Sequence, residues 1–331
     1  MHIPDGFLDA KTALTSGVLA VAGVGLALRT VRRSVPARRV PLIGLTAAFV
    51  FVAQMLNFPV AGGTSGHLIG AVLAAVLLGP SAAVLVMTAV LILQCLMFAD
   101  GGVTALGANL FNMAIVAPGV GYAIYAIVRR LAGGGLRARL LGTAFAAWCS
   151  TVTASIACAG QLALSGTVAW GVALPAMSGI HALIGIGEAL ISALVVAGVA
   201  QIRPELLAGA EDSSRRARHG ASVVHGLLIS LGLAIFVAPF ASAWPDGLER
   251  VASRLGFEHR AAGMPLLASP LHDYTLPGVR SVALSTILAG CAGTGIAFGL
   301  AYLLARALTP RSAAARSRPA EGGSTDASRP A

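Results

Sequence analysis

The chain has few charged side chains for its length. Only 11% of its residues are charged, whereas 56% are hydrophobic, and the mean hydropathy is +0.83. A soluble domain of this size would not tolerate so large an apolar excess. The balance therefore excludes a soluble enzyme or binding module and predicts an all-α polytopic membrane protein.

Short motifs of several function classes are also missing. No Gly-x-x-x-x-Gly-Lys-Ser/Thr loop is present to bind phosphates, so energy from ATP would have to come from a partner. The metal spacings His-x-x-x-His and Cys-x-x-Cys are absent. The cysteines lie within apolar runs without paired spacing, which predicts buried thiols rather than a disulfide framework or a thiolate metal site. They are Cys95, Cys149, Cys158 and Cys291.

The apolar runs are numerous enough for about nine membrane spans. They cover residues 16–28, 41–57, 68–78, 82–98, 108–128, 141–164, 177–200, 223–241 and 282–304, and the third is short. A polar segment follows the seventh run and predicts a domain boundary. We expect one membrane domain at 1–203, a cytoplasmic linker at 204–220, a second membrane unit at 221–306 and a disordered cytoplasmic tail at 307–331.

The basic residues, which give a net charge of +10, gather in short loops. Membrane topology rather than nucleic-acid binding explains this pattern, because cytoplasmic loops are enriched in Lys and Arg. The clusters at 29–39 and 129–139 then mark the cytoplasmic side. Counting crossings puts Met1, His67 and Asp100 together on the other side. We expect a multi-pass protein of the bacterial inner membrane, surrounded by lipid, with its N-terminus extracytoplasmic and its C-terminus cytoplasmic.

The first two residues form a candidate metal chelate. The Met1 amine, the deprotonated amide nitrogen of His2 and the His2 imidazole can close two fused rings around one divalent cation. Three nitrogens at the corners of a square suit Ni²⁺ or Cu²⁺ better than Zn²⁺. The alternative is that Met1 is merely the start residue and His2 a surface side chain.

His67 is the natural fourth ligand for such a square. The glycines of segment 62–66 precede it and let the backbone approach another chain segment closely. Alternatively, a histidine at the start of a helix is an ordinary interface residue.

Polar side chains near these ligands are candidates for orienting the two imidazoles, since a ligating ring usually donates its other nitrogen to an oxygen. The alternative is that they join helices by hydrogen bonds, the interpretation we favour for Glu188. The candidates are Gln54, Asn57, Thr64, Ser65, Asn109 and His181.

Several segments resemble the CbiM/NikM family, the substrate-binding components of energy-coupling factor (ECF) ABC transporters for nickel and cobalt. The resemblance covers about residues 1–203. It rests on M-H-I-P-D-G-F at the start, Q-M-L-N-F-P and G-G-T-S-G-H-L within 54–68, D-G-G at 100–102, G-A-N-L-F-N-M at 107–113 and H-A-L-I-G-I-G-E at 181–188. The second part is similar to the CbiN/NikN subunit in its "PDGLE" form, through P-D-G-L-E-R-V-A at 245–252 and P-L-H-D-Y at 270–274.

The resemblance implies a seven-helix bundle fused to a two-helix unit with an extracytoplasmic loop. It implies Ni²⁺ or Co²⁺, with nickel slightly favoured, as a transported ligand held by the Met1 amine, the His2 amide and ring and the His67 ring, and no prosthetic group. The implied partners are a transmembrane coupling (T) subunit like CbiQ/NikQ and an ATP-binding subunit like CbiO/NikO.

Two other functions stay open from the sequence. A stand-alone secondary carrier or channel should place ionisable residues along its path, and Glu188 is the only carboxylate deep within a run. An intramembrane metalloenzyme would need an open coordination position and a positioned acid or base.

Overall fold

Long helices dominate the structure, a computed structural model that describes residues 1–207, 219–261 and 267–309. Within those ranges eight helical segments are long and apolar enough to cross a membrane. This confirms the prediction of an all-α polytopic membrane protein. The helices that build them are α1 (Ala10–Ser34), η1 (Ala37–Arg39) with α2 (Val40–Met55), α4 (Pro80–Leu93) with η2 (Gln94–Phe98), α5 (Leu106–Asn109) with η3 (Leu110–Val116) and α6 (Ala117–Leu131), α7 (Gly135–Leu164), α8 (Trp170–Ile202), α9 (His219–Phe236) with η5 (Ala238–Phe240), and α11 (Val282–Leu308).

The third expected span differs from the others. Its helix, α3 (Ala71–Leu78), has only eight residues and is therefore about 12 Å long, too short to cross a bilayer alone. A β-hairpin precedes it, formed by β1 (Phe58–Val60) and antiparallel β2 (Thr64–Gly66). Gly70 has a φ of 75°, in the left-handed region, so the helix begins only after it. His67 consequently lies on irregular backbone between the hairpin and α3.

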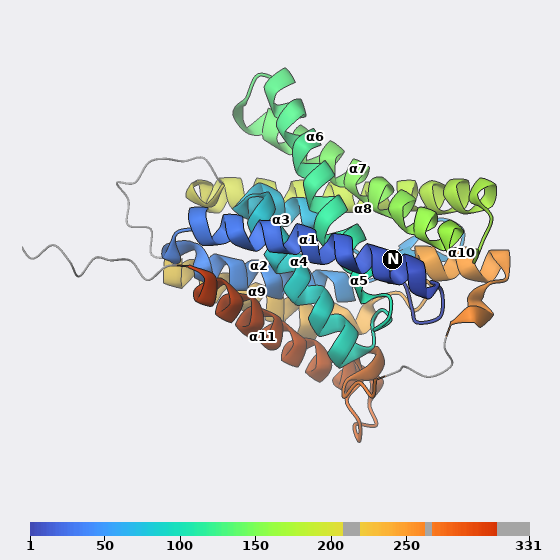
Figure 1. Cartoon of the computed structure of the whole chain (residues 1–331). Coiled ribbons are helices and arrows are strands. Elements are labelled where there is room, and N and C mark those ends of the chain that lie inside the picture. Colours follow the sequence, from blue (N-terminus) through green and yellow to red (C-terminus); the bar gives the residue numbers. More distant parts are fainter. Residues whose placement is uncertain (208–218, 262–266, 310–331) are drawn as a thin grey trace, which may run out of the picture.

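The helices of the C-terminal unit pack against the first part of the chain. Both α9 and α11 lie along α2, and α11 also contacts α4. Phe51 of α2 and Phe98 of η2 meet there with ring centroids 5.2 Å apart. Tyr274, from the loop before α11, stacks on Phe98 with a centroid distance of 4.7 Å. Figure 1 shows the amino terminus beside α5 and α10, while the connection between α6 and α7 projects from the rest of the molecule.

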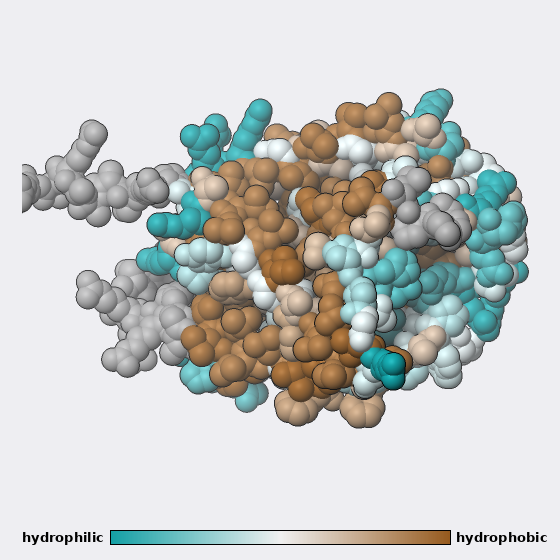
Figure 2. All heavy atoms as spheres, turned by 90° about the horizontal axis from the view of Figure 1, so that it is seen from below, coloured by the Kyte–Doolittle hydropathy of each residue, from teal (hydrophilic) through white to brown (hydrophobic). Residues whose placement is uncertain are grey.

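The outer surface carries a broad hydrophobic band. In Figure 2, hydrophobic residues gather over the middle of the molecule and hydrophilic residues lie towards its ends. Large apolar side chains on three different helices are more than half exposed, for example Val21 of α1 (73%), Leu194 of α8 (62%) and Ile229 of α9 (61%). Such a surface is stable in a lipid environment but not in water.

Shorter elements fill the loop between η5 and α11. They are α10 (Gly247–Leu255), η6 (Glu258–Arg260) and η7 (His272–Tyr274). A separate short helix, η4 (Pro204–Leu206), follows α8. Asp246 begins α10: its side chain accepts the N–H of Glu249, whose own side chain accepts the N–H of Asp246. This reciprocal cap fixes the start of the helix.

The expected linker and tail fall mostly on residues 208–218 and 310–331, which lie outside the described ranges. All four cysteines lie within the described ranges and are free there; Cys95 and Cys158 are buried as expected, whereas Cys149 and Cys291 are only partly buried.

Candidate metal-binding site

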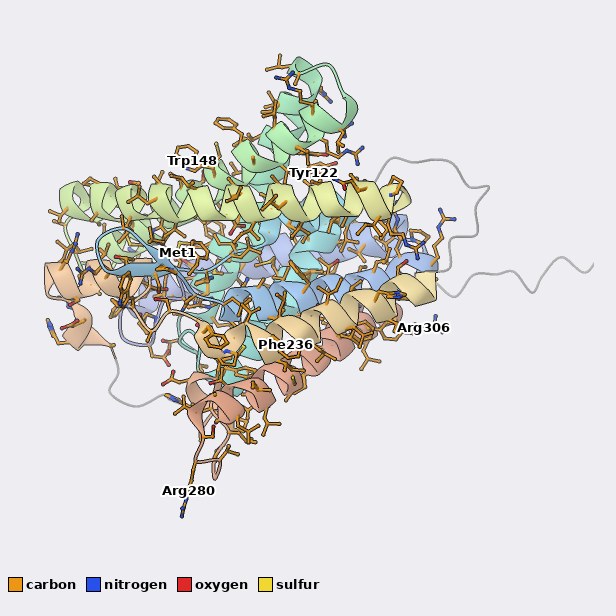
Figure 3. All side chains as sticks on the ribbon, turned by 180° about the vertical axis from the view of Figure 1, so that it is seen from behind. Met1, Tyr122, Trp148, Phe236, Arg280 and Arg306 are labelled. Carbon is orange, nitrogen blue, oxygen red and sulfur yellow. The ribbon has the colours of Figure 1, made fainter. Side chains whose placement is uncertain are left out.

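The amino-terminal segment is inserted into the bundle rather than lying on its surface. Met1 is 3% exposed and Ile3 is fully buried. Asn109 holds Ile3 from both sides: its Oδ1 accepts the Ile3 N–H at 2.8 Å and its Nδ2 donates to the Ile3 carbonyl at 3.1 Å. The N–H of Gly102 donates to the same carbonyl at 2.8 Å. The first residue is thereby held at a defined place, at the opposite end of the bundle from Arg306 (Figure 3).

The glycine pair at 101–102 leaves space for this segment. A Cβ atom on Gly102 would collide with the backbone of Pro4 and Asp5. Asp5 is anchored beside it, because its Oδ1 accepts both the N–H and the hydroxyl of Thr104. The D-G-G motif therefore serves close packing between the 100–104 loop and the amino terminus.

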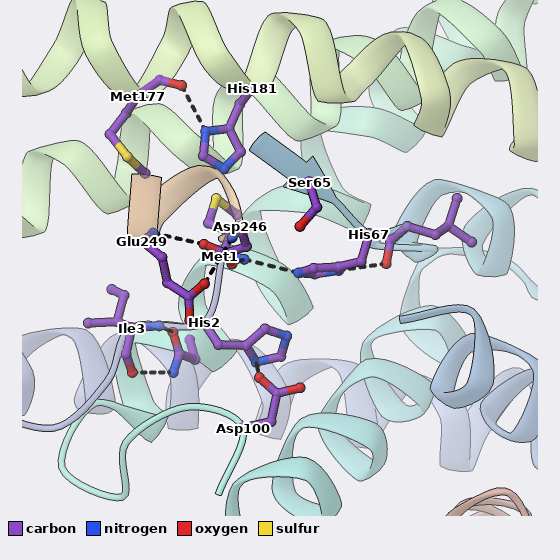
Figure 4. A network of polar contacts seen from close by, with 12 residues as sticks. Met1, His2, Ile3, Ser65, His67, Asp100, Met177, His181, Asp246 and Glu249 are labelled. Carbon is purple, nitrogen blue, oxygen red and sulfur yellow. Dashed lines mark hydrogen bonds and ion pairs between the residues drawn. The ribbon is translucent and has the colours of Figure 1, made fainter. Parts of the chain in front are cut away.

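The Met1 amine and His67 are in direct contact. The amine nitrogen lies 3.0 Å from Nε2 of His67, and Nδ1 of the same ring lies 3.1 Å from the Leu68 carbonyl (Figure 4). A carbonyl only accepts, so Nδ1 carries the proton and the Nε2 lone pair faces the amine. Burial, aided by repulsion from the Met1 ammonium, lowers the pKa of His67 to about 3. The ring is therefore neutral at pH 7, the form that binds metals.

His2 lies beside His67, with ring centroids 5.3 Å apart. Its Nδ1 is 3.5 Å from Oδ1 of Asp100, and the other oxygen of Asp100 accepts the Tyr274 hydroxyl at 2.6 Å. Nε2 of His2 is buried without a hydrogen-bond partner within the described residues. Burial lowers the pKa of His2, although Asp100 opposes the shift. The two rings thus differ: His67 turns Nε2 to the Met1 amine, whereas His2 turns Nδ1 to Asp100 and leaves Nε2 unpartnered among the described residues.

Two buried side chains hold the irregular segment that carries His67. Gln54 donates its Nε2 to the Ile69 carbonyl at 2.8 Å. Glu188 accepts the N–H groups of Ile69 at 2.5 Å and Gly70 at 2.9 Å. We expected Glu188 to join helices, but its carboxylate satisfies backbone that no helix or strand satisfies. It positions His67 from two residues away.

The other candidates for orienting the rings form no hydrogen bond to either ring within the described residues. His181 donates its Nδ1 to the Met177 carbonyl of its own helix at 2.8 Å. Asn57 Oδ1 and Thr64 Oγ1 are buried without a partner in the described part of the chain. Asn109, as shown above, acts on Ile3. The two rings are oriented instead by Leu68 and Asp100.

The C-terminal unit closes the site, which the sequence did not lead us to expect. Oδ2 of Asp246 lies 2.6 Å from the Met1 amine. Ser65 holds this loop, because its N–H donates to the Pro245 carbonyl at 2.9 Å and its hydroxyl to the Trp244 carbonyl at 2.6 Å. Burial by itself would raise the pKa of Asp246, but the Met1 ammonium and His67 together hold it well below its usual range.

Close approach of this loop depends on Gly247. A Cβ atom there would lie 2.8 Å from Cε1 of His181 and 2.8 Å from Cδ1 of Ile184. Met1, His67, His181, Asp246 and Gly247 accordingly line one small cavity. The D-x-x-E spacing at 246–249 is a sequence signal for a helix start, but nothing local in it indicates a partner at residue 1.

The assembled site offers an amine, two neutral imidazoles and two carboxylates, Asp246 beside the amine and Asp100 beside His2. Nitrogen donors of this kind suit late first-row divalent cations.

Comparison with known proteins agrees with this chemistry. Residues 2–206 match the family model CbiM, described as the cobalt uptake substrate-specific transmembrane region, and residues 220–310 match the PDGLE domain. The chain is 38% identical to the putative fused nickel transport protein NikMN of Archaeoglobus fulgidus, over 92% of this chain and 98% of that protein. It is 34% identical to the fused nickel transport protein NikMN of Rhodobacter capsulatus, over 93% and 100%.

A solved structure is similar as well. The crystal structure of a truncated transition metal transporter covers 61% of this chain and 99% of its own, with a TM-score of 0.56 and 37% sequence identity. Family model, full-length relatives and fold therefore point the same way. The chain belongs to the CbiM family of membrane transport proteins and carries a C-terminal PDGLE domain.

Proposed function

We propose that this chain captures Ni²⁺ or Co²⁺ for import, with the Met1 amine, the His2 amide nitrogen and ring, and the His67 ring as ligands. The observation that carries the proposal is the contact of the buried Met1 amine with His67 Nε2 at 3.0 Å. The names of the two fused relatives support nickel, and the family description supports cobalt. We favour nickel slightly, because a square of nitrogens suits it.

The proposed ligand atoms differ in how much they must move to bind a cation. His67 Nε2 already faces the amine, so it needs little rearrangement. Chelation by His2 uses Nδ1, which faces Asp100 at 3.5 Å. When the two fused chelate rings close, His2 Nδ1 would therefore leave Asp100 and bind the cation instead. Asp100 would hold His2 ready before capture and receive it again after release.

The site would face the extracytoplasmic side. Arginines stand in the last turns of α1, α6 and α11, and Arg306 lies at the end of the bundle remote from Met1 (Figure 3). By the preference of basic residues for the cytoplasmic face, that end lies inside the cell. Residues 1–203 would form the metal-binding domain, and 221–306 the PDGLE unit that covers it.

Uptake would be driven by partners of the energy-coupling factor type. The chain has no phosphate-binding loop of its own, so ATP hydrolysis would occur on a CbiO/NikO-like subunit. A CbiQ/NikQ-like T subunit would transmit it through contact with the exposed apolar helix faces. Among these, α8 and α9 each carry several half-exposed aliphatic side chains.

A one-residue extension tests the proposal. Adding one glycine before Met1 replaces the amine by an amide and moves the new amine away from His67, so Ni²⁺ binding should fall at least 100-fold, about 2.7 kcal/mol. Isothermal titration calorimetry on the purified full chain measures this. The matched control adds one glycine after Ala331 and should bind like the unmodified chain. Equal affinity of the two extended proteins would remove the amino-terminal chelate from the proposal.

A further inference from the structure

The two oxygens of the Asp246 carboxylate have different partners. Oδ1 accepts the Glu249 N–H at 2.9 Å and caps α10, whereas Oδ2 lies 2.6 Å from the Met1 amine. The loop is held in place independently of this ion pair, through the two hydrogen bonds from Ser65. Asp246 is 15% exposed at its side chain and Met1 is 2% exposed. A carboxylate is thus fixed, largely out of water, beside an atom that would bind the proposed cation.

Charge balance shows what this carboxylate can do. The Met1 ammonium now pairs with the Asp246 carboxylate, while Asp100 lies 3.5 Å from His2 Nδ1 with its side chain 26% exposed. In the proposed complex the cation replaces two protons, one from the ammonium and one from the His2 amide, so Asp246 keeps a positive partner beside it. Asp246 is the more buried of the two carboxylates and the one in contact with a proposed ligand atom. Removing its charge would therefore leave the buried cation with less compensation, which is unfavourable.

We propose that Asp246 is the anionic partner of the bound cation, so that the PDGLE domain completes the metal site. This rests on the proposed function. A different role would be a latch, in which Asp246 only stabilises the ammonium. A latch competes with the metal, because the cation can bind only after the ammonium has lost its proton. The two roles predict opposite effects on affinity when the negative charge is removed.

The test is Asp246→Asn in the full chain, with Ni²⁺ binding measured by calorimetry. Asparagine caps helices about as well as aspartate, so α10 should persist. We expect affinity to fall by about 10- to 100-fold, as for other groups that support a metal site. Unchanged or tighter binding would overturn the proposal in favour of a latch or a purely structural carboxylate.

Two controls make the outcome specific. Asp273→Asn removes the same charge from the same loop at an exposed side chain and should leave the affinity unchanged. Asp246→Ser keeps a capping hydroxyl without the charge, and serves if the asparagine variant does not fold. If the unmodified chain itself binds no Ni²⁺, the proposed function fails. If the unmodified chain binds and both Asp246 variants bind equally well, only the role of Asp246 fails.

Discussion

Asn109 gives a sharp test of how the amino terminus is positioned. Asn109→Ala removes both hydrogen bonds to Ile3, each contributing about 1 kcal/mol. The Ile3 N–H is then buried without a partner, which adds about 1–2 kcal/mol, whereas the carbonyl keeps the bond from Gly102. Docking of the segment is weakened by roughly 2–4 kcal/mol in all. Ni²⁺ affinity should therefore fall by up to about 30- to 1,000-fold.

The assay combines calorimetry with aminopeptidase digestion followed by intact-mass measurement. The variant should lose residues from its amino terminus faster than the unmodified chain. Asn112→Ala is the matched control, because Asn112 is also buried but bonds Gln161 at 2.8 Å instead of the amino-terminal segment. It should lower thermal stability without changing affinity or digestion. Full affinity together with full protection in Asn109→Ala would refute the reasoning.

Two further predictions concern the imidazoles and their support. The pKa of His67 is about 3 in the folded protein and about 6.5 in an unfolded chain. Between these pH values the unfolded state binds more protons than the folded state. The stability of the fold should therefore decrease as the pH drops from about 6.5 towards 3. The melting temperature should thus decrease between pH 7 and pH 5, and less so in His67→Ala; an equal decrease in both would exclude His67 as the cause. Tyr274→Phe removes the hydroxyl that donates to Asp100 and should weaken Ni²⁺ binding about 3- to 10-fold, corresponding to one hydrogen bond, measured by calorimetry. Tyr302→Phe is its control, and equal affinities would show that the hydroxyl does not act on the site.

Much of the fold could be predicted because apolar runs of membrane length have few other uses. Every expected span except the third overlaps a long helix. The exception, residues 68–78, is apolar throughout, and apolar composition does not distinguish a buried helix from buried extended backbone. What decides it is Glu188, which accepts the N–H groups of Ile69 and Gly70 from 118–119 positions away in the sequence.

The site could be predicted only in part, for a similar reason. Counting crossings and the glycines before it predict His67 on the same side as Met1, and the two residues lie in contact. The position of Asp246 depends on how α9 and α11 pack against α2, and it meets Met1 across 245 positions of sequence. Local spacing identifies Asp246 as a helix cap and nothing more. The same holds for Asp100, whose partner His2 is fixed by the tertiary fold.

The ion pair between Met1 and Asp246 joins two units that belong to one chain. Since α11 and α9 both lie along α2, the PDGLE loop never has to find the site by diffusion. Intramolecular tethering of this kind corresponds to effective concentrations in the millimolar range. If the loop were encoded as a separate protein, it would have to reach millimolar concentration in the membrane or bind the bundle with an affinity of its own. Only then would it be present each time the site is occupied. Fusion therefore fixes the stoichiometry of the two units at one to one and makes closure of the site independent of expression level.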